Sequence, residues 1–167
     1  LVFSLPAPET PAAPSDPGRK NLTVALGVMT YYGWANAATS GENTFQAYID
    51  KIVRFAGYLL REGHSIRLVI GEHSDRRAAD ELLARLPTAS IHSVPPFCAV
   101  PQIDSLEDVL REIAAADLAV VTRFHNAVCA LMLDKPVVSI GYSDKNDSLL
   151  ADMGLGAFCQ HIDSFDL

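Results

Sequence analysis

The sequence predicts an α/β domain built on a parallel sheet with helices on both faces. Short apolar runs rich in Val, Ile and Leu alternate along the chain with segments whose apolar residues recur every three or four positions. The first pattern is typical of strands and the second of amphipathic helices. Their strict alternation favours a parallel sheet, and the nearly continuous apolar character of the strand-like runs favours strands that are buried on both faces.

The first eighteen residues differ from the rest. Residues 1–5 are a strand-like apolar fragment, and residues 6–18 hold half of the ten prolines. Proline at this density favours an extended connector over a packed element. We therefore expect residues 1–18 to be the end of an upstream segment and a linker, residues 19–167 to form the domain, and the chain to be a fragment of a longer protein.

The first half of the domain begins with the strand-like run Asn21 to Met29. A long loop follows, in which Tyr31 and Trp34 either bind a ligand or cover an edge of the core. The apolar period then predicts a helix from Thr44, with Asn43 as its cap and Gly63 as its end. A second strand is expected over Ser65 to Gly71.

The second half repeats the alternation. It contains a helix between Ser74 and Pro87, a third strand at Ala89 to Val94, and a helix from Ser105 to Ala115 whose start resembles a capping box made by Asp104 and Glu107. A strand at Leu118 to Val121, a nearly apolar helix ending at Leu133, a strand opened by Pro136 and a helical segment from Asp144 to Met153 complete the pattern.

A polar corner at Thr122 to Asn126 joins the strand at Leu118 to the apolar helix. If the sheet has the order 3-2-1-4-5 with right-handed crossovers, the chain reverses direction between the first strand and this one, and ligands bind at such a switch point. We expect the loop after Met29, the corner and the segment Tyr142 to Lys145 to share one crevice there.

The corner carries groups that suit an anion. Arg123 presents a planar fork that matches carboxylate or phosphate, His125 can donate a hydrogen bond or a proton near neutral pH, and a helix N-terminus adds backbone N–H groups without partners. The residues leave an alternative open, in which Arg123 pairs with an acid such as Asp117 and His125 caps the helix.

Further motifs follow the corner Arg123-Phe124-His125 in a fixed order. They are an alanine-containing helix, Pro136-Val137, the segment Tyr142 to Lys145, and Met153-Gly154-Leu155. This combination over residues 111–155 closely resembles the C-terminal signature of the polysaccharide pyruvyl transferase family. One difference is Asn126, because the family commonly has glycine directly after the histidine.

The resemblance implies a Rossmann-like domain that forms the C-terminal half of a glycosyltransferase B-like two-domain fold. It implies transfer of a pyruvyl group from phosphoenolpyruvate to a sugar of an exopolysaccharide or cell-surface glycan, which forms a pyruvate ketal without a cofactor or metal. Under this hypothesis His125 is the catalytic acid, Arg123 clamps phosphate or carboxylate, and Lys145 contacts a second anionic group. The other expected substrate contacts are Phe124, Asn126, Tyr142, Tyr31 and Trp34.

The expected partners are phosphoenolpyruvate, a glycan or lipid-linked saccharide acceptor, and an N-terminal domain of the same protein that supplies the other half of the site. The fragment alone is therefore expected to be inactive. Whether the protein forms a homo-oligomer is left open by the sequence. The net charge of −7 argues against binding to nucleic acid. No apolar run approaches the roughly 20 residues that cross a bilayer. We therefore expect a cytoplasmic protein, and a location at the inner face of the membrane is compatible with this expectation.

Two alternatives stay open at this point. A nucleotide-sugar-dependent glycosyltransferase of the same architecture is the first, because a fold does not fix its donor. A non-catalytic α/β module that binds an anionic metabolite is the second.

Overall fold

The computed structural model describes residues 21–33, 38–87 and 96–166. Within these ranges, parallel strands form one six-stranded sheet in the order β3-β2-β1-β4-β5-β6. The strands are β1 (Thr23–Val28), β2 (Ser65–Ile70), β3 (Cys98–Ala99), β4 (Leu118–Val121), β5 (Val137–Gly141) and β6 (Cys159–His161). The predicted α/β class is confirmed as a Rossmann-like fold, and the direction reverses between β1 and β4 as expected. The predicted linker at residues 1–18 lies outside the described residues.

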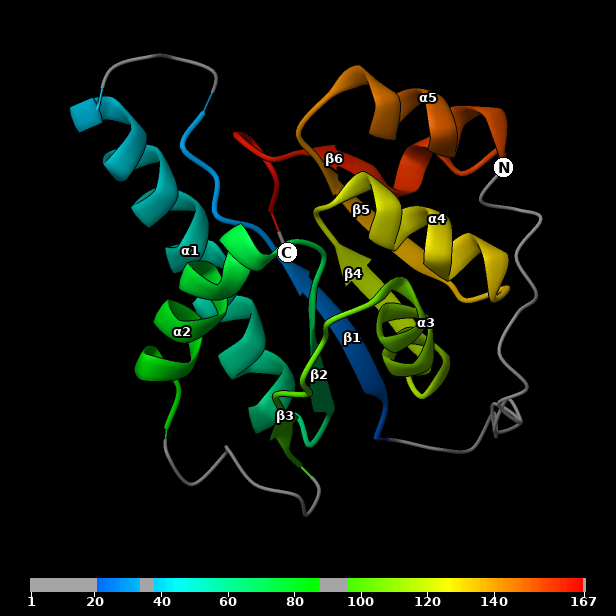
Figure 1. The fold of residues 1–167 in the computed structure, drawn as a ribbon, viewed down its shortest axis with the longest axis horizontal. Coiled ribbons are helices and arrows are strands. Elements are labelled where there is room, and N and C mark those ends of the chain that lie inside the picture. The colour runs from blue at the N-terminus through cyan, green and yellow to red at the C-terminus, as the bar shows by residue number, and fades with distance from the viewer. Residues whose placement is uncertain (1–20, 34–37, 88–95, 167) are drawn as a thin grey trace.

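Helices cover both faces of the sheet. They are α1 (Ala38–Arg61), α2 (Arg76–Arg85), α3 (Leu106–Ala114), α4 (Phe124–Met132) and α5 (Asp144–Asp152), with 3-10 turns η2 (His73–Asp75) and η4 (Gly156–Phe158). Helices α1 and α2 lie against one face, and α3, α4 and α5 lie against the other (Figure 1). This arrangement explains why the central strands are apolar at almost every position.

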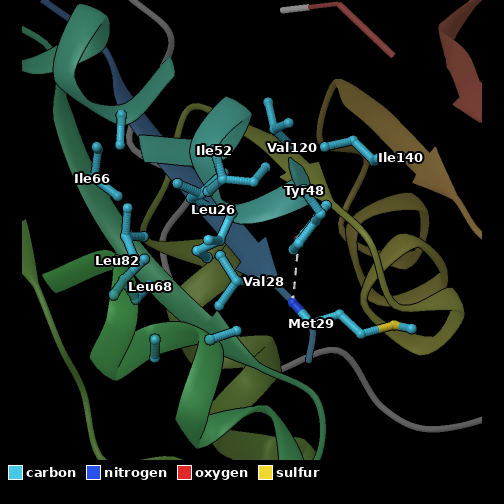
Figure 2. Packing of buried hydrophobic residues seen from close by; sticks show 14 of the residues in the cluster. Leu26, Val28, Met29, Tyr48, Ile52, Ile66, Leu68, Leu82, Val120 and Ile140 are labelled. Carbon is cyan, nitrogen blue, oxygen red and sulfur yellow. Dashed lines mark hydrogen bonds between the residues drawn. The ribbon is translucent and has the colours of Figure 1, made fainter. Parts of the chain in front are cut away.

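The larger core lies between the sheet and helices α1 and α2. Alternate residues of β1 and β2 point into it, and Tyr48, Ile52 and Leu82 meet them from the helices (Figure 2). The second core uses smaller side chains, including Ala25 and Ala119 from the sheet and Ala127 and Ala130 from α4. Small residues on both sides let α4 approach the sheet closely, and this places its N-terminus against the ends of β1 and β4.

Several predicted boundaries change. Helix α1 begins at Ala38, so Asn43 lies inside the helix and does not cap it, whereas Gly63, with φ of 87°, ends it as predicted. The capping box of α3 is formed by Ser105 and Asp108, one residue later than predicted. Ser105 is extended immediately before the helix, so its hydroxyl can accept the Asp108 N–H, while the Asp108 carboxylate accepts the Ser105 N–H at 3.0 Å.

The edge strands are the least predictable part of the sheet. The third strand in the structure is the two-residue β3, which pairs with Ile66 and Arg67, and the predicted strand at Ala89 to Val94 lies outside the described residues. The sequence did not predict β6, which adds three residues beside β5. Segments this short carry too few residues to show a periodic pattern.

None of the described helices is long and apolar enough to cross a membrane.

Candidate functional site

The corner between β4 and α4 is fixed by an ion pair with a residue far away in the sequence. Arg123 donates from Nε to Asp75 Oδ2 at 2.9 Å and from Nη2 to Asp75 Oδ1 at 2.8 Å, and its Nη2 also lies 3.2 Å from the carboxylate of Glu72. Asp75 is fully buried, and its Oδ1 also accepts the Thr30 N–H at 3.0 Å. The acid that pairs with Arg123 is therefore Asp75.

The alternative left open by the sequence, that Arg123 pairs with an acid, is what the structure has, but the example given there, Asp117, is not the partner. The carboxylate of Asp117 instead accepts the Thr23 N–H at 2.7 Å, at the opposite end of β1. Asp117 precedes β4 and Arg123 follows it, so the strand itself holds the two side chains apart. A bidentate pair with a buried carboxylate fixes the orientation of the guanidinium.

The positive charge of Arg123 lies close to two negative charges, those of Asp75 and Glu72. Burial acts to lower the pKa of Arg123, but the hydrogen bonds and charges of Asp75, together with the charge of Glu72, outweigh it and raise the pKa. Arg123 therefore stays charged, and its charge is largely compensated by its own neighbours. An anionic ligand that contacts Arg123 has to compete with Asp75 for it.

A buried hydroxyl network holds the strand ends beneath the corner. Thr122 donates to the Gly27 carbonyl at 3.2 Å, and its Oγ1 lies 2.9 Å from the hydroxyl of Tyr48. The Tyr48 hydroxyl also accepts the Met29 N–H at 3.2 Å (Figure 2). Burial raises the pKa of Tyr48 to about 12, so this hydroxyl stays protonated. The network ties β1, α1 and β4 together where the functional corner begins.

The first turn of α4 presents His125 and Asn126. No side chain caps this helix, and no acidic residue lies in its first turn. The alternative in which the His125 side chain caps the helix is therefore wrong. The His125 side chain is exposed and lies edge-on to Phe124, with ring centroids 5.7 Å apart.

A pocket of about 270 Å³ lies beside this first turn, at the carboxyl end of β2. Its wall combines apolar residues with imidazole, guanidinium, hydroxyl, amide and carboxylate groups. The lining residues are Ile70, Gly71, Glu72, His73, Arg76, Ile103, Asp104, Ser105, Leu106, Val109, His125 and Asn126. The pocket therefore draws on four segments, namely β2 with the residues after it, η2 with the start of α2, the start of α3 and the start of α4.

Two glycines make room for the corner. A Cβ on Gly71 would lie 3.0 Å from Arg123 Cγ and 3.1 Å from Asn126 Oδ1, and one on Gly27 would lie 3.0 Å from Asn126 Nδ2. Asn126 is only 1% exposed, and its Nδ2 has no hydrogen-bond partner among the described residues. The Asn126 side chain is thus accommodated by a glycine on β1 and by another directly after β2.

The other residues singled out from the sequence divide among separate places. Tyr142 lies beside the corner, with the Arg123 guanidinium 6.0 Å from its ring centroid. Phe124 and Lys145 line a different, open pocket along α5. Tyr31 is 4% exposed and belongs to the larger core, and Trp34 lies outside the described residues. The structure thus brings Arg123, Tyr142, His125 and Asn126 together and does not bring Lys145 or Tyr31 into the pocket of His125.

Sequence reasoning missed the residues that η2 and the start of α2 contribute, which are His73, Asp75 and Arg76. Their position directly after β2 was the available signal, because the carboxyl ends of parallel strands meet at one edge of a sheet. Among the described residues, no group of three or more His, Cys, Asp or Glu side chains is arranged to hold a metal ion.

Comparison with known proteins gave a match to a protein-family model. A family model described as polysaccharide pyruvyl transferase matches residues 1–144. Neither the comparison with curated proteins nor that with solved structures gave a match. The matched segment spans the sheet from β1 to β5 and includes the corner and every residue that lines the His125 pocket. The chain therefore belongs to the polysaccharide pyruvyl transferase family of transferases.

Proposed function

We propose that this chain supplies the donor side of a site that transfers a pyruvyl group from phosphoenolpyruvate to a pair of hydroxyls on a glycan. The observation that carries the proposal is the pocket beside α4, into which His125 and Asn126 open in a member of this family. Its volume of about 270 Å³ lies below the roughly 300–1,000 Å³ of sites for drug-sized ligands. A small anion suits this space better than a nucleotide sugar.

The proposed reaction forms a ketal in two additions. A proton is added to the methylene carbon of phosphoenolpyruvate, which leaves an oxocarbenium-like centre at the neighbouring carbon. One sugar hydroxyl attacks this carbon and loses its proton, and inorganic phosphate leaves with the electrons of its C–O bond. The second hydroxyl then attacks the same carbon and loses its proton, which closes the cyclic pyruvate ketal.

His125 is the proposed acid for the first step. His125 lines the pocket and is exposed, so its ring can reach a bound ligand. General acids typically contribute about 100-fold to 10,000-fold to a rate. Arg123 is the proposed contact for phosphate or carboxylate at the corner, with Tyr142 packed beside it, whereas the contact of Lys145 with a second anionic group requires a ligand that extends toward α5.

The acceptor half of the site is proposed to come from another domain of the same protein. His125 is exposed in this chain. Protonation of phosphoenolpyruvate forms an oxocarbenium-like centre, and water has to be kept away from this reactive intermediate. A second domain that closes over the pocket would exclude water and bring the sugar hydroxyls to the donor. The 167-residue chain alone is therefore proposed to bind the donor without turning it over.

A ligand-shift experiment followed by an activity assay tests this function. We expect phosphoenolpyruvate to raise the melting temperature of the chain and UDP-glucose not to do so. In the two-domain protein, the His125→Gln variant should lower acceptor-dependent phosphate release by about 100-fold or more. The matched control is His161→Gln, because His161 is also exposed but lies on β6, away from the pocket.

Three outcomes would contradict the proposal. Stabilisation by UDP-glucose alone would identify a nucleotide-sugar enzyme, and donor binding without phosphate release in the two-domain protein would identify a binding module. An unchanged rate in His125→Gln would remove the acid role of this residue.

A further inference from the structure

The pocket beside α4 is lined by hydrogen-bond donors that the protein itself does not satisfy. The side chains of His73, Arg76 and His125 make no hydrogen bond or ion pair to any described residue. Asn126 also lines the pocket, and its buried Nδ2 has no hydrogen-bond partner among the described residues. Because buried polar groups are normally hydrogen-bonded, an unsatisfied amide beside three further donors indicates a ligand rich in acceptor oxygens.

The charges around the pocket single out one of these donors. Arg123 faces the two carboxylates of Asp75 and Glu72, so this group of three carries no net positive charge. The carboxylate of Asp104 also lines the pocket and accepts a hydrogen bond from Gln102. Arg76 is the one permanently charged cation among the described residues that line the pocket. A ligand with several negative charges therefore needs Arg76 to offset the nearby carboxylates.

We propose that Arg76 is a donor-binding residue of this site, and that its guanidinium binds the phosphate group of phosphoenolpyruvate together with His125 and the Asn126 amide. The identity of the ligand rests on the proposed function. Arg76 comes from the start of α2 and His125 from the start of α4, so the two side chains reach the pocket from opposite sides of the β1 strand in sheet order. The phosphate would thus be held by two residues, Arg76 and His125, that are 49 positions apart in the sequence (125 − 76).

The neighbouring arginine provides a matched control. Successive residues of an α-helix point about 100° apart, and Arg77 turns away from the pocket. Its Nη2 donates to Glu42 at 2.7 Å, its Nη1 donates to the hydroxyl of Tyr32, and its guanidinium lies 4.5 Å from the ring centroid of Phe45. Arg76→Gln and Arg77→Gln thus remove the same charge from adjacent positions on two different surfaces.

The test measures binding of inorganic phosphate and of phosphoenolpyruvate to the chain by isothermal titration calorimetry. We expect Arg76→Gln to weaken binding of both probes by about tenfold or more, because a charge-assisted hydrogen bond is lost, and Arg77→Gln to change it by less than about twofold. Arg76→Lys should recover part of the affinity, since it keeps the charge without the planar fork. Circular dichroism checks that each variant is folded, and the exposed position of Arg76 favours this.

Each result decides for or against Arg76. Equal binding by wild type and Arg76→Gln, equal weakening by both glutamine variants, or no binding of either probe by the wild type would overturn the assignment. Two further results separate it from the proposed reaction. Binding that depends on Arg76, without pyruvyl transfer by the two-domain protein, would leave the assignment standing and remove the reaction. Pyruvyl transfer with an unchanged KM for phosphoenolpyruvate in Arg76→Gln would do the reverse.

Discussion

Replacement of Asp75 by asparagine tests how the corner is held. Asp75 is fully buried and receives two hydrogen bonds from Arg123 and one from the Thr30 N–H. Asparagine keeps an oxygen that can accept from one of these donors but removes the charge. The guanidinium of Arg123, whose side chain is 14% exposed, would then lose its buried partner while remaining charged.

The expected cost follows from this geometry. Removing one partner of a buried ion pair typically costs about 3–5 kcal/mol. Two features reduce this value here, since the carboxylate of Glu72 remains 3.2 Å from Arg123 and the asparagine oxygen still accepts one hydrogen bond. We therefore expect the free energy of unfolding to fall by roughly 2–3 kcal/mol, which for a domain of this size lowers the melting temperature by roughly 4–12 °C.

The assay is urea unfolding followed by circular dichroism, with Glu72→Gln as the control. The side chain of Glu72 is 55% exposed, so its loss should cost no more than about 1 kcal/mol. A double-mutant cycle with Arg123→Gln should give a coupling energy of about 1–3 kcal/mol between Asp75 and Arg123. If Asp75→Asn is as stable as the wild type, or if the cycle shows no coupling, the pair does not hold the corner as described.

Two further predictions concern the elements beneath the site. Tyr48→Phe should lower the free energy of unfolding by about 1–3 kcal/mol because the buried Met29 N–H loses its acceptor. The folded pKa of Tyr48 is raised from 10.0 to about 12, so its contribution is fully present below pH 10 and is lost as pH rises toward 12. Urea midpoints measured across this window should therefore fall less steeply in Tyr48→Phe, and parallel curves would contradict the assignment. Gly27→Ala should cost roughly 1–3 kcal/mol, since the new Cβ would lie 2.9 Å from Val121 Cγ1. Its control is Gly156→Ala, whose Cβ would come no closer than 3.7 Å to a neighbour, and equal melting temperatures for the two variants would argue against the tight fit.

The sequence by itself determined the central part of the fold. Strand β4 begins and ends at the predicted residues, Gly63 ends α1, and the corner containing Arg123 and His125 lies at the start of α4. These features depend on local rules, because apolar runs predict buried strands, glycine suits positive φ, and a helix needs a periodic apolar face. The edge strands β3 and β6 escaped prediction because two or three residues are too few to show a pattern.

Tertiary structure alone decided the partners of the corner. Asp75 is 48 residues from Arg123 in the sequence and meets it because β1, β2 and β4 lie in register, with Val28 beside Ile70 and Gly27 beside Val121. The same register brings Arg76 and His73 to the pocket of His125, whereas Lys145 reaches a different surface and Tyr31 enters the core. Local patterns show which residues end a strand. Which of those ends become neighbours depends on the strand order and on the glycines that let the side chains cross between them.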